Sequence, residues 1–166
     1  MKSVLPLFAA LIVLIGCSAE PSAAQPGGMD RLSAYDTIDA CLYREPSPEG
    51  RQSCIGEYRS ACERLAADGE TTVGVMQCAA DEYEDWDRWL HEVYRDLREG
   101  LPEGSVAQLR EAQRSWMAHR DQDCEYLAGL YAGGSLENVE RASCQVRKTA
   151  QRAIELMHWD EAYPPL

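Results

Sequence analysis

The sequence lacks an apolar run long enough to cross a membrane. Its longest apolar stretch, residues 4–15, is interrupted by Pro6. That length falls far short of the roughly 20 residues that a membrane-spanning helix needs. Lys2 precedes the stretch, and a positive charge before a short apolar segment is typical of a signal peptide. We therefore expect residues 1–16 to direct export.

The end of this segment predicts a lipid anchor. Gly16 precedes Cys17 and follows two aliphatic residues, a pattern that resembles the processing site of bacterial lipoproteins. The resemblance implies a lipid on Cys17; an ordinary signal peptide that happens to contain a cysteine is the alternative. After Cys17 the chain is small, polar and rich in Pro and Gly, so residues 17–28 are expected to form an anchor and flexible linker. A single domain is expected over residues 29–166.

Basic residues are scarce compared with acidic ones. The chain has 16 Lys and Arg against 28 Asp and Glu, a formal net charge of -12. Such a charge argues against nucleic acid and anionic lipid surfaces as partners. Membrane attachment is therefore expected through the lipid anchor only. The charge fits a cationic partner, although acidic surfaces also serve solubility alone.

The motifs of common catalytic and metal sites are absent. The sequence has no Gly-x-Ser-x-Gly, phosphate-binding loop, His-Glu-x-x-His or Cys-x-x-Cys, and its three histidines are scattered. We therefore expect no enzymatic activity, no metal and no cofactor. One acidic run is more typical of a solvated helix face than of an acid–base site: Asp81, Glu82, Glu84, Asp85 and Asp87.

Apolar residues recur every three or four positions, the spacing of amphipathic helices, and no strand pattern is found. The clearest stripe ends before Gly100 and Pro102, and Thr71 or Thr72 is its expected N-cap. Further helices are predicted over 30–43, 51–67, 103–129 and from 136 onward, with a turn at 45–50. The predicted fold is an all-α, disulfide-stapled antiparallel bundle of four to five helices. The stripe consists of Ala79, Tyr83, Trp86, Leu90, Val93 and Leu97.

Six cysteines follow Cys17, and an even number in an exported chain predicts three disulfides. Cysteines adjacent in sequence flank the predicted helix junctions, and short junctions make neighbouring helices antiparallel. The sequence cannot settle the connectivity. The layout favours the pairs Cys41–Cys54, Cys62–Cys78 and Cys124–Cys144.

Residues 112–124 place Gln113, Trp116, Arg120 and Cys124 on one helix face. An arginine beside a core tryptophan needs a partner, which we expect to be an acidic residue of the preceding helix. A structural ion-pair network of this kind is the favoured interpretation. The alternative is a contact patch, because Trp and Arg are frequent interface anchors. It would comprise Arg114, Trp116, Arg120 and Asp121.

The same block resembles the LprI-like lysozyme-inhibitor family of bacterial envelope proteins, in its Ala-Gln-Arg, Trp, Arg-Asp and Cys at the family's spacings. Upstream residues fit the preceding family helix, and Cys144, Thr149, Arg152 and Leu156 fit the final one. The resemblance marks as candidate binding or motif residues Asp87, Tyr94, Gln113, Arg114, Trp116, Arg120 and Asp121.

The resemblance implies a binding protein of the cell envelope, in the periplasm or on the outer membrane as a lipoprotein. Its expected partner is a cationic lysozyme. The alternative is a non-catalytic scaffold that docks on another envelope protein. A protruding acidic or aromatic loop would favour the inhibitor, and a flat apolar helix face would favour the scaffold. The loop expected to protrude is residues 129–136.

Overall fold

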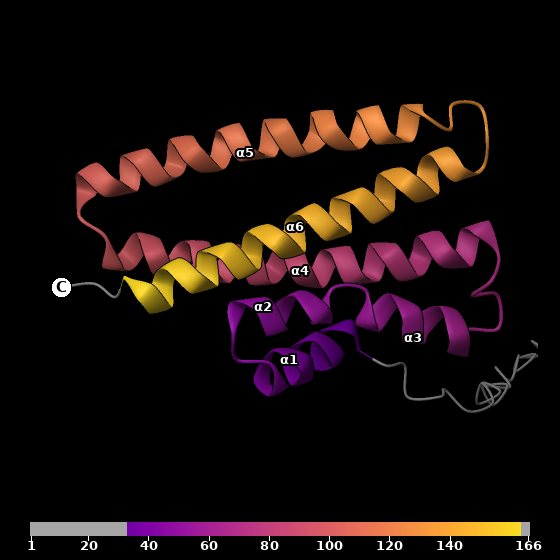
Figure 1. Ribbon diagram of the computed structural model, residues 1–166, viewed down its shortest axis with the longest axis horizontal. Coiled ribbons are helices and arrows are strands. Elements are labelled where there is room, and N and C mark those ends of the chain that lie inside the picture. The colour runs from indigo at the N-terminus through magenta and orange to yellow at the C-terminus, as the bar shows by residue number, and fades with distance from the viewer. Residues whose placement is uncertain (1–32, 164–166) are drawn as a thin grey trace, which may run out of the picture. The chain divides into compact units, whose positions relative to one another are not determined.

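A computed structural model describes residues 33–163. The predicted signal peptide, the lipid anchor on Cys17 and the linker lie outside the described residues. The described part is all-α without strands, and five of its helices are longer than one turn, which confirms the predicted fold class. The elements, shown in Figure 1, are α1 (Ala34–Arg44), α2 (Pro48–Arg51), the 3₁₀ helix η1 (Gln52–Cys54), α3 (Glu57–Leu65), α4 (Thr72–Gly100), α5 (Glu103–Gly129) and α6 (Leu136–Ala162).

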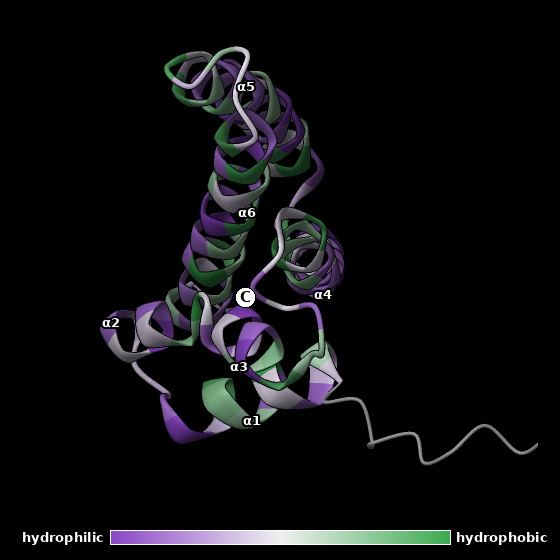
Figure 2. Ribbon diagram, turned by 90° about the vertical axis from the view of Figure 1, so that its right-hand side faces the viewer, coloured by the Kyte–Doolittle hydropathy of each residue, from purple (hydrophilic) through white to green (hydrophobic). Residues whose placement is uncertain are grey.

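The core lies between α4 and α6. Consecutive long helices alternate in direction, so α4 and α6 run the same way (Figure 1). The helices α5 and α2 pack on α6, whereas α1 and α3 pack on α4. Trp86, Ile154 and Leu156 are fully buried between these layers. Figure 2 shows hydrophobic residues on the side of α4 toward α6 and hydrophilic residues on the opposite side. Between residues 33 and 163, no helix combines the length and the apolar character needed to cross a bilayer.

The segment before α4 differs from the predicted continuous helix over 51–67. The chain forms η1, is extended at Ile55 and turns at Gly56, whose φ of 87° lies in the left-handed region. Glycine adopts this conformation without the steric cost that a Cβ would bring. The predicted turn at 45–50 is also wrong in part, because α2 begins at Pro48, where Ser47 Oγ accepts the Gly50 N–H at 3.0 Å.

Glu82 of α4 holds the start of α3. Its side chain is fully buried, and its two carboxylate oxygens accept the N–H groups of Gly56 at 2.7 Å and Arg59 at 2.8 Å. Trp86 Nε1 donates to the same carboxylate at 3.3 Å. Gly56 has no side chain to cap α3, so Glu82 supplies the anion that a helix N-terminus favours. The expected solvated acidic face is therefore wrong for Glu82, and also for the buried Asp85.

Three disulfides join helices that are close in sequence, with the pairing that the sequence layout favours. Their Cα–Cα distances are 5.7, 5.7 and 5.4 Å, within the usual range. Each closes a short loop, and by the chain-entropy estimate a loop of this size contributes about 3 kcal/mol to stability. The pairs are Cys41–Cys54 between α1 and η1, Cys62–Cys78 between α3 and α4, and Cys124–Cys144 between α5 and α6.

Candidate functional site

Part of the sequence motif forms a buried polar seam between α5 and α6, made of Gln113, Trp116, Arg120, Thr149 and Arg152. Gln113 Oε1 accepts from Arg152 Nε at 3.0 Å, and Arg120 Nη1 donates to Thr149 Oγ1 at 3.3 Å. The Trp116 ring lies 5.1 Å from the guanidinium carbon of Arg120 and 5.8 Å from that of Arg152. These contacts combine hydrogen bonding with cation–π attraction. The seam therefore holds α5 in register on α6.

Arg120 does not pair with an acidic residue of α4, so that expectation is wrong. Its contact on α4 is the hydroxyl of Tyr83 at 3.4 Å, and the carboxylate beside it belongs to the exposed Asp121 at 2.9 Å. The buried acids of α4 have other partners: Glu82 caps α3, and Asp85 pairs with Arg88. Because the seam residues bond one another, their polar groups are not presented to a partner.

The remaining motif residues lie on the surface. Tyr94 and Arg114, together with the buried Gln113 of the seam, line a groove between α4 and α5. Asp87 contacts His91 Nε2 at 3.5 Å and does not line this groove. Asp121 is exposed and pairs only with its neighbour in the seam. The motif is thus distributed between the seam and the groove, with Gln113 in both and with Asp87 and Asp121 in neither.

This arginine groove has a volume of about 610 Å³ and is lined by residues of α4 and α5. Five of the chain's 16 Lys and Arg residues line it, with Glu92 as its one acidic residue. It is therefore a basic surface in an acidic protein. Its lining comprises Arg88, Leu90, His91, Glu92, Tyr94, Arg95, Arg98, Arg110, Gln113, Arg114 and Met117.

A second surface lies at the junction of α5 and α6, where the chain turns at one end of the bundle (Figure 1). Four large apolar side chains are exposed here within eleven residues, at 45% to 70% of their surface. We call this surface the α5–α6 corner and define it by Tyr126, Leu130, Tyr131 and Leu136. Three of its residues, Leu130, Tyr131 and Leu136, belong to the loop 129–136 that the sequence predicts to protrude.

Polar contacts brace the corner beside the third disulfide. Arg141 pairs with Glu125 at 3.1 Å and with Glu137 at 3.3 Å, and these carboxylates raise the pKa of Arg141. Glu137 also accepts the Gly133 N–H at 3.0 Å; this hydrogen bond and then Arg141 lower the pKa of Glu137. Gly133 has a φ of 81°, which favours glycine. These contacts therefore fix the turn that carries the exposed side chains of the corner.

Residues 62–156, more than half of the chain, match the protein-family model described as lysozyme inhibitor LprI. The chain belongs to the LprI family. This result confirms the resemblance carried by the α5 motif. A relative of this LprI-family chain, Uncharacterized protein R02472 of Rhizobium meliloti (strain 1021), is 30% identical over 148 residues, which cover 89% of each chain. No solved structure matches the chain.

The family match of this LprI-family protein covers three of its surfaces. The polar seam, the arginine groove and the α5–α6 corner all lie within the matched residues. Sequence analysis missed the groove. Its signal is the spacing of Arg88, His91, Arg95 and Arg98 by three, four and three positions, which places them along one face of α4.

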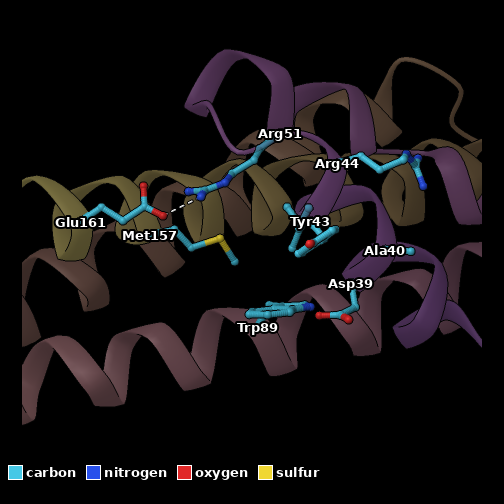
Figure 3. A pocket seen from close by; sticks show the side chains of 9 residues that line it. Asp39, Ala40, Tyr43, Arg44, Arg51, Trp89, Met157 and Glu161 are labelled. Atoms are coloured by element: carbon cyan, nitrogen blue, oxygen red, sulfur yellow. Dashed lines mark hydrogen bonds and ion pairs between the residues drawn. The ribbon is translucent and has the colours of Figure 1, made fainter.

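A further cavity of about 680 Å³ lies among α1, α2, α4 and α6, mostly outside the matched residues (Figure 3). Arg51 Nη2 donates to Glu161 Oε1 at 2.5 Å across its edge. Arg51 Nη1 and Trp89 Nε1 are buried without a hydrogen-bond partner in the described part of the chain. With Leu42 and Met157 in its lining, this cavity offers donors beside apolar surface.

One group of potential metal ligands occurs among residues 33–163. It consists of Cys41, Cys54 and Glu57, whose ligand atoms lie within 4.8 Å of one another. The two sulfurs are joined in a disulfide, whereas a metal binds the thiolate form of cysteine. In the oxidised protein these two sulfurs are therefore not available as thiolate ligands.

Proposed function

We propose that this LprI-family protein is an exported, non-catalytic inhibitor that binds a cationic lysozyme through the α5–α6 corner. The family description supports inhibition, and the corner carries the proposal because it exposes two tyrosines and two leucines on a braced turn. Tyrosine is frequent among the residues that dominate binding energy. A surface already held in shape also loses less entropy on binding.

The proposal includes a location in the cell envelope. Residues 1–16 would direct export and Cys17 would carry the lipid, with residues 18–28 as the spacer to the helical domain. Three disulfides fit an oxidising compartment outside the cytoplasm. Mass spectrometry of the mature N-terminus tests the anchor, since an unmodified terminus beyond Cys17 would exclude it.

Charge and shape would have separate roles in binding. The net charge of -12 speeds the encounter with a cationic enzyme, an effect that salt weakens. The exposed apolar side chains of the corner then supply the short-range contact. Glycosidases act with two carboxylates on either side of the scissile bond, so a loop that occupies this cleft blocks substrate without any chemistry of its own.

A lysis assay tests this function. The purified mature protein should slow the lysis of peptidoglycan by a cationic lysozyme, and less so at high salt. Replacing two corner residues, Tyr126→Ala/Tyr131→Ala, should weaken inhibition about tenfold or more, because hot-spot truncations each cost roughly 1–2 kcal/mol. Tyr163→Ala is the matched control, since Tyr163 is exposed but lies away from the corner.

The lysis assay, combined with a pull-down from membranes, also tests the scaffold alternative. No effect on several lysozymes at micromolar excess would contradict inhibition. Recovery of a stoichiometric envelope protein from membranes, together with unchanged lysis, would instead establish the scaffold role.

A further inference from the structure

We propose that the arginine groove between α4 and α5 binds an acidic peptide segment of a protein partner. This site is separate from the α5–α6 corner and does not depend on lysozyme binding. In this proposal the peptide carboxylates pair with the arginines, and its apolar side chains lie against Leu90, Tyr94 and Met117.

The distribution of charge points to an anionic ligand. The chain carries 28 acidic residues, yet only Glu92 is among the eleven residues that line the groove, against five arginines. Arg88, Arg95 and Arg114 pair with acids outside the lining, which are Asp85, Asp96 and Glu111. Arg98 and Arg110 have no ion pair in the described part of the chain, so the lining keeps an excess of positive charge. Clefts lined by one sign of charge concentrate ligands of the other sign.

The geometry suits a short extended chain. Arg88, Arg95 and Arg98 stand on α4, and Arg110 and Arg114 stand on α5. The α4 row covers ten residue steps, or about 15 Å at the helical rise. An extended peptide covers that length with about five residues. Guanidinium groups bind carboxylates through two parallel hydrogen bonds, which makes arginine well matched to Asp and Glu side chains.

Arg88 is held by Asp85 and by the Tyr35 ring, whereas the other four arginines are available to a ligand. Arg95 pairs with Asp96 at 2.8 Å and Arg114 with Glu111 at 2.5 Å, and all four side chains are more than half exposed. Exposed pairs of this kind contribute little stability, so a ligand carboxylate can replace them. Arg110 is exposed and has no ion pair among residues 33–163.

The lining favours a peptide over other polyanions. Tyr94 is half-buried and Met117 is 40% exposed, so accessible apolar surface lies among the arginines. A polyphosphate has no group to bury there. A membrane surface is flat and cannot follow a groove between two helices, and the acidic remainder of the protein would be repelled by anionic lipid.

Fluorescence anisotropy of a labelled peptide of alternating Glu and Leu tests the proposal with the full chain. We expect saturable binding that weakens with salt, and no binding of the Lys–Leu analogue. Arg110→Glu/Arg114→Glu should lower affinity about tenfold or more, and Arg110→Glu alone about threefold. Arg64→Glu on α3 is the matched control for the single reversal, because Arg64 is also exposed and unpaired in the described structure.

Three results would overturn the proposal. They are equal binding by the wild type and the double variant, equal loss with Arg64→Glu, and tighter binding of polyphosphate or anionic vesicles than of the peptide. Circular dichroism should show unchanged helix content in every variant. Arg110→Gln, which removes the charge but leaves a polar side chain, replaces any variant whose helix content falls. Peptide binding by Tyr126→Ala/Tyr131→Ala should equal that of the wild type, whether or not lysozyme is inhibited.

Discussion

The two sides of the α4–α6 core are built differently. On the α1–α3 side, Cys41–Cys54 ties α1 to η1 and Cys62–Cys78 ties α3 to α4, and buried apolar residues such as Ile38 and Leu42 pack in the core. On the other side, α5 is 27 residues long and buries only Leu109, Gln113, Cys124 and Ala128. A long helix with so little buried apolar surface depends on specific bonds: the polar seam along its length and one disulfide near its end.

This difference determines which side of the helical domain offers surface for binding. The α1–α3 side buries Ile38 and Leu42 and contributes mainly stability, although Tyr43 and Leu65 are exposed on it. The α5 side leaves most of its surface to solvent, and it contributes to both the arginine groove and the α5–α6 corner. Fixing α5 by a narrow polar contact keeps it in place while its other faces stay accessible.

The largest expected effect comes from Glu82 on the α1–α3 side. Glu82→Ala removes the acceptor of three N–H groups, from Gly56, Arg59 and Trp86. Leaving buried donors unpaired is costly, so we expect a loss of about 3–5 kcal/mol in the free energy of unfolding, measured by urea denaturation. Glu84→Ala, at an exposed position of the same helix, should change stability by less than about 0.5 kcal/mol. A similar small loss in both variants would show that Glu82 does not hold α3.

The polar seam should behave differently, with a smaller effect that depends on the pairing. Gln113→Leu alone leaves Arg152 Nε without its acceptor, at a cost of about 1–3 kcal/mol. Gln113→Leu/Arg152→Met removes both polar groups, and with them the Arg152 Nη2 that is buried without a partner. Replacing a buried polar pair by apolar residues is often neutral or stabilising, so the double variant should recover most of the loss.

A double-mutant cycle by urea denaturation measures this coupling. If the losses in Gln113→Leu and Arg152→Met sum to the loss in the double variant, the two seam residues act independently. In that case the α5 side would be held by apolar packing, as the α1–α3 side is, and the contrast between them would disappear.

The sequence predicted the long helices well and the region before α4 poorly, for a physical reason. The apolar stripe from Ala79 to Leu97 could be recognised in the sequence because its members all face the same core, so their spacing follows the helical repeat. The break at Gly56 depends on Glu82, a residue 26 positions away, and local periodicity cannot report such a contact.

The candidate surfaces show the same limit. The corner follows from a short loop between two predicted helices, so its position could be expected from sequence. The arginine groove arises because α4 and α5 bring two separate rows of arginines to one place. Each row alone resembles a solvated helix face, which is why their combination was missed.

The smallest expected effect is that of acidic pH on the stability of the α5–α6 corner. The Gly133 N–H and Arg141 hold the pKa of Glu137 below its ordinary value of about 4.3. A carboxyl group with a lowered folded-state pKa adds stability above its unfolded-state pKa and loses it as pH falls through the folded-state value. Glu137→Gln should therefore reduce the hydrogen-exchange protection of the Gly133 N–H at neutral pH. The wild type should lose further protection below about pH 4, and the Glu137→Gln variant should lack most of this additional loss. Glu140→Gln makes the same charge change on α6, and its protection should follow the wild type at every pH. A corner that loses protection equally in both variants would owe its shape to the Cys124–Cys144 disulfide rather than to Glu137.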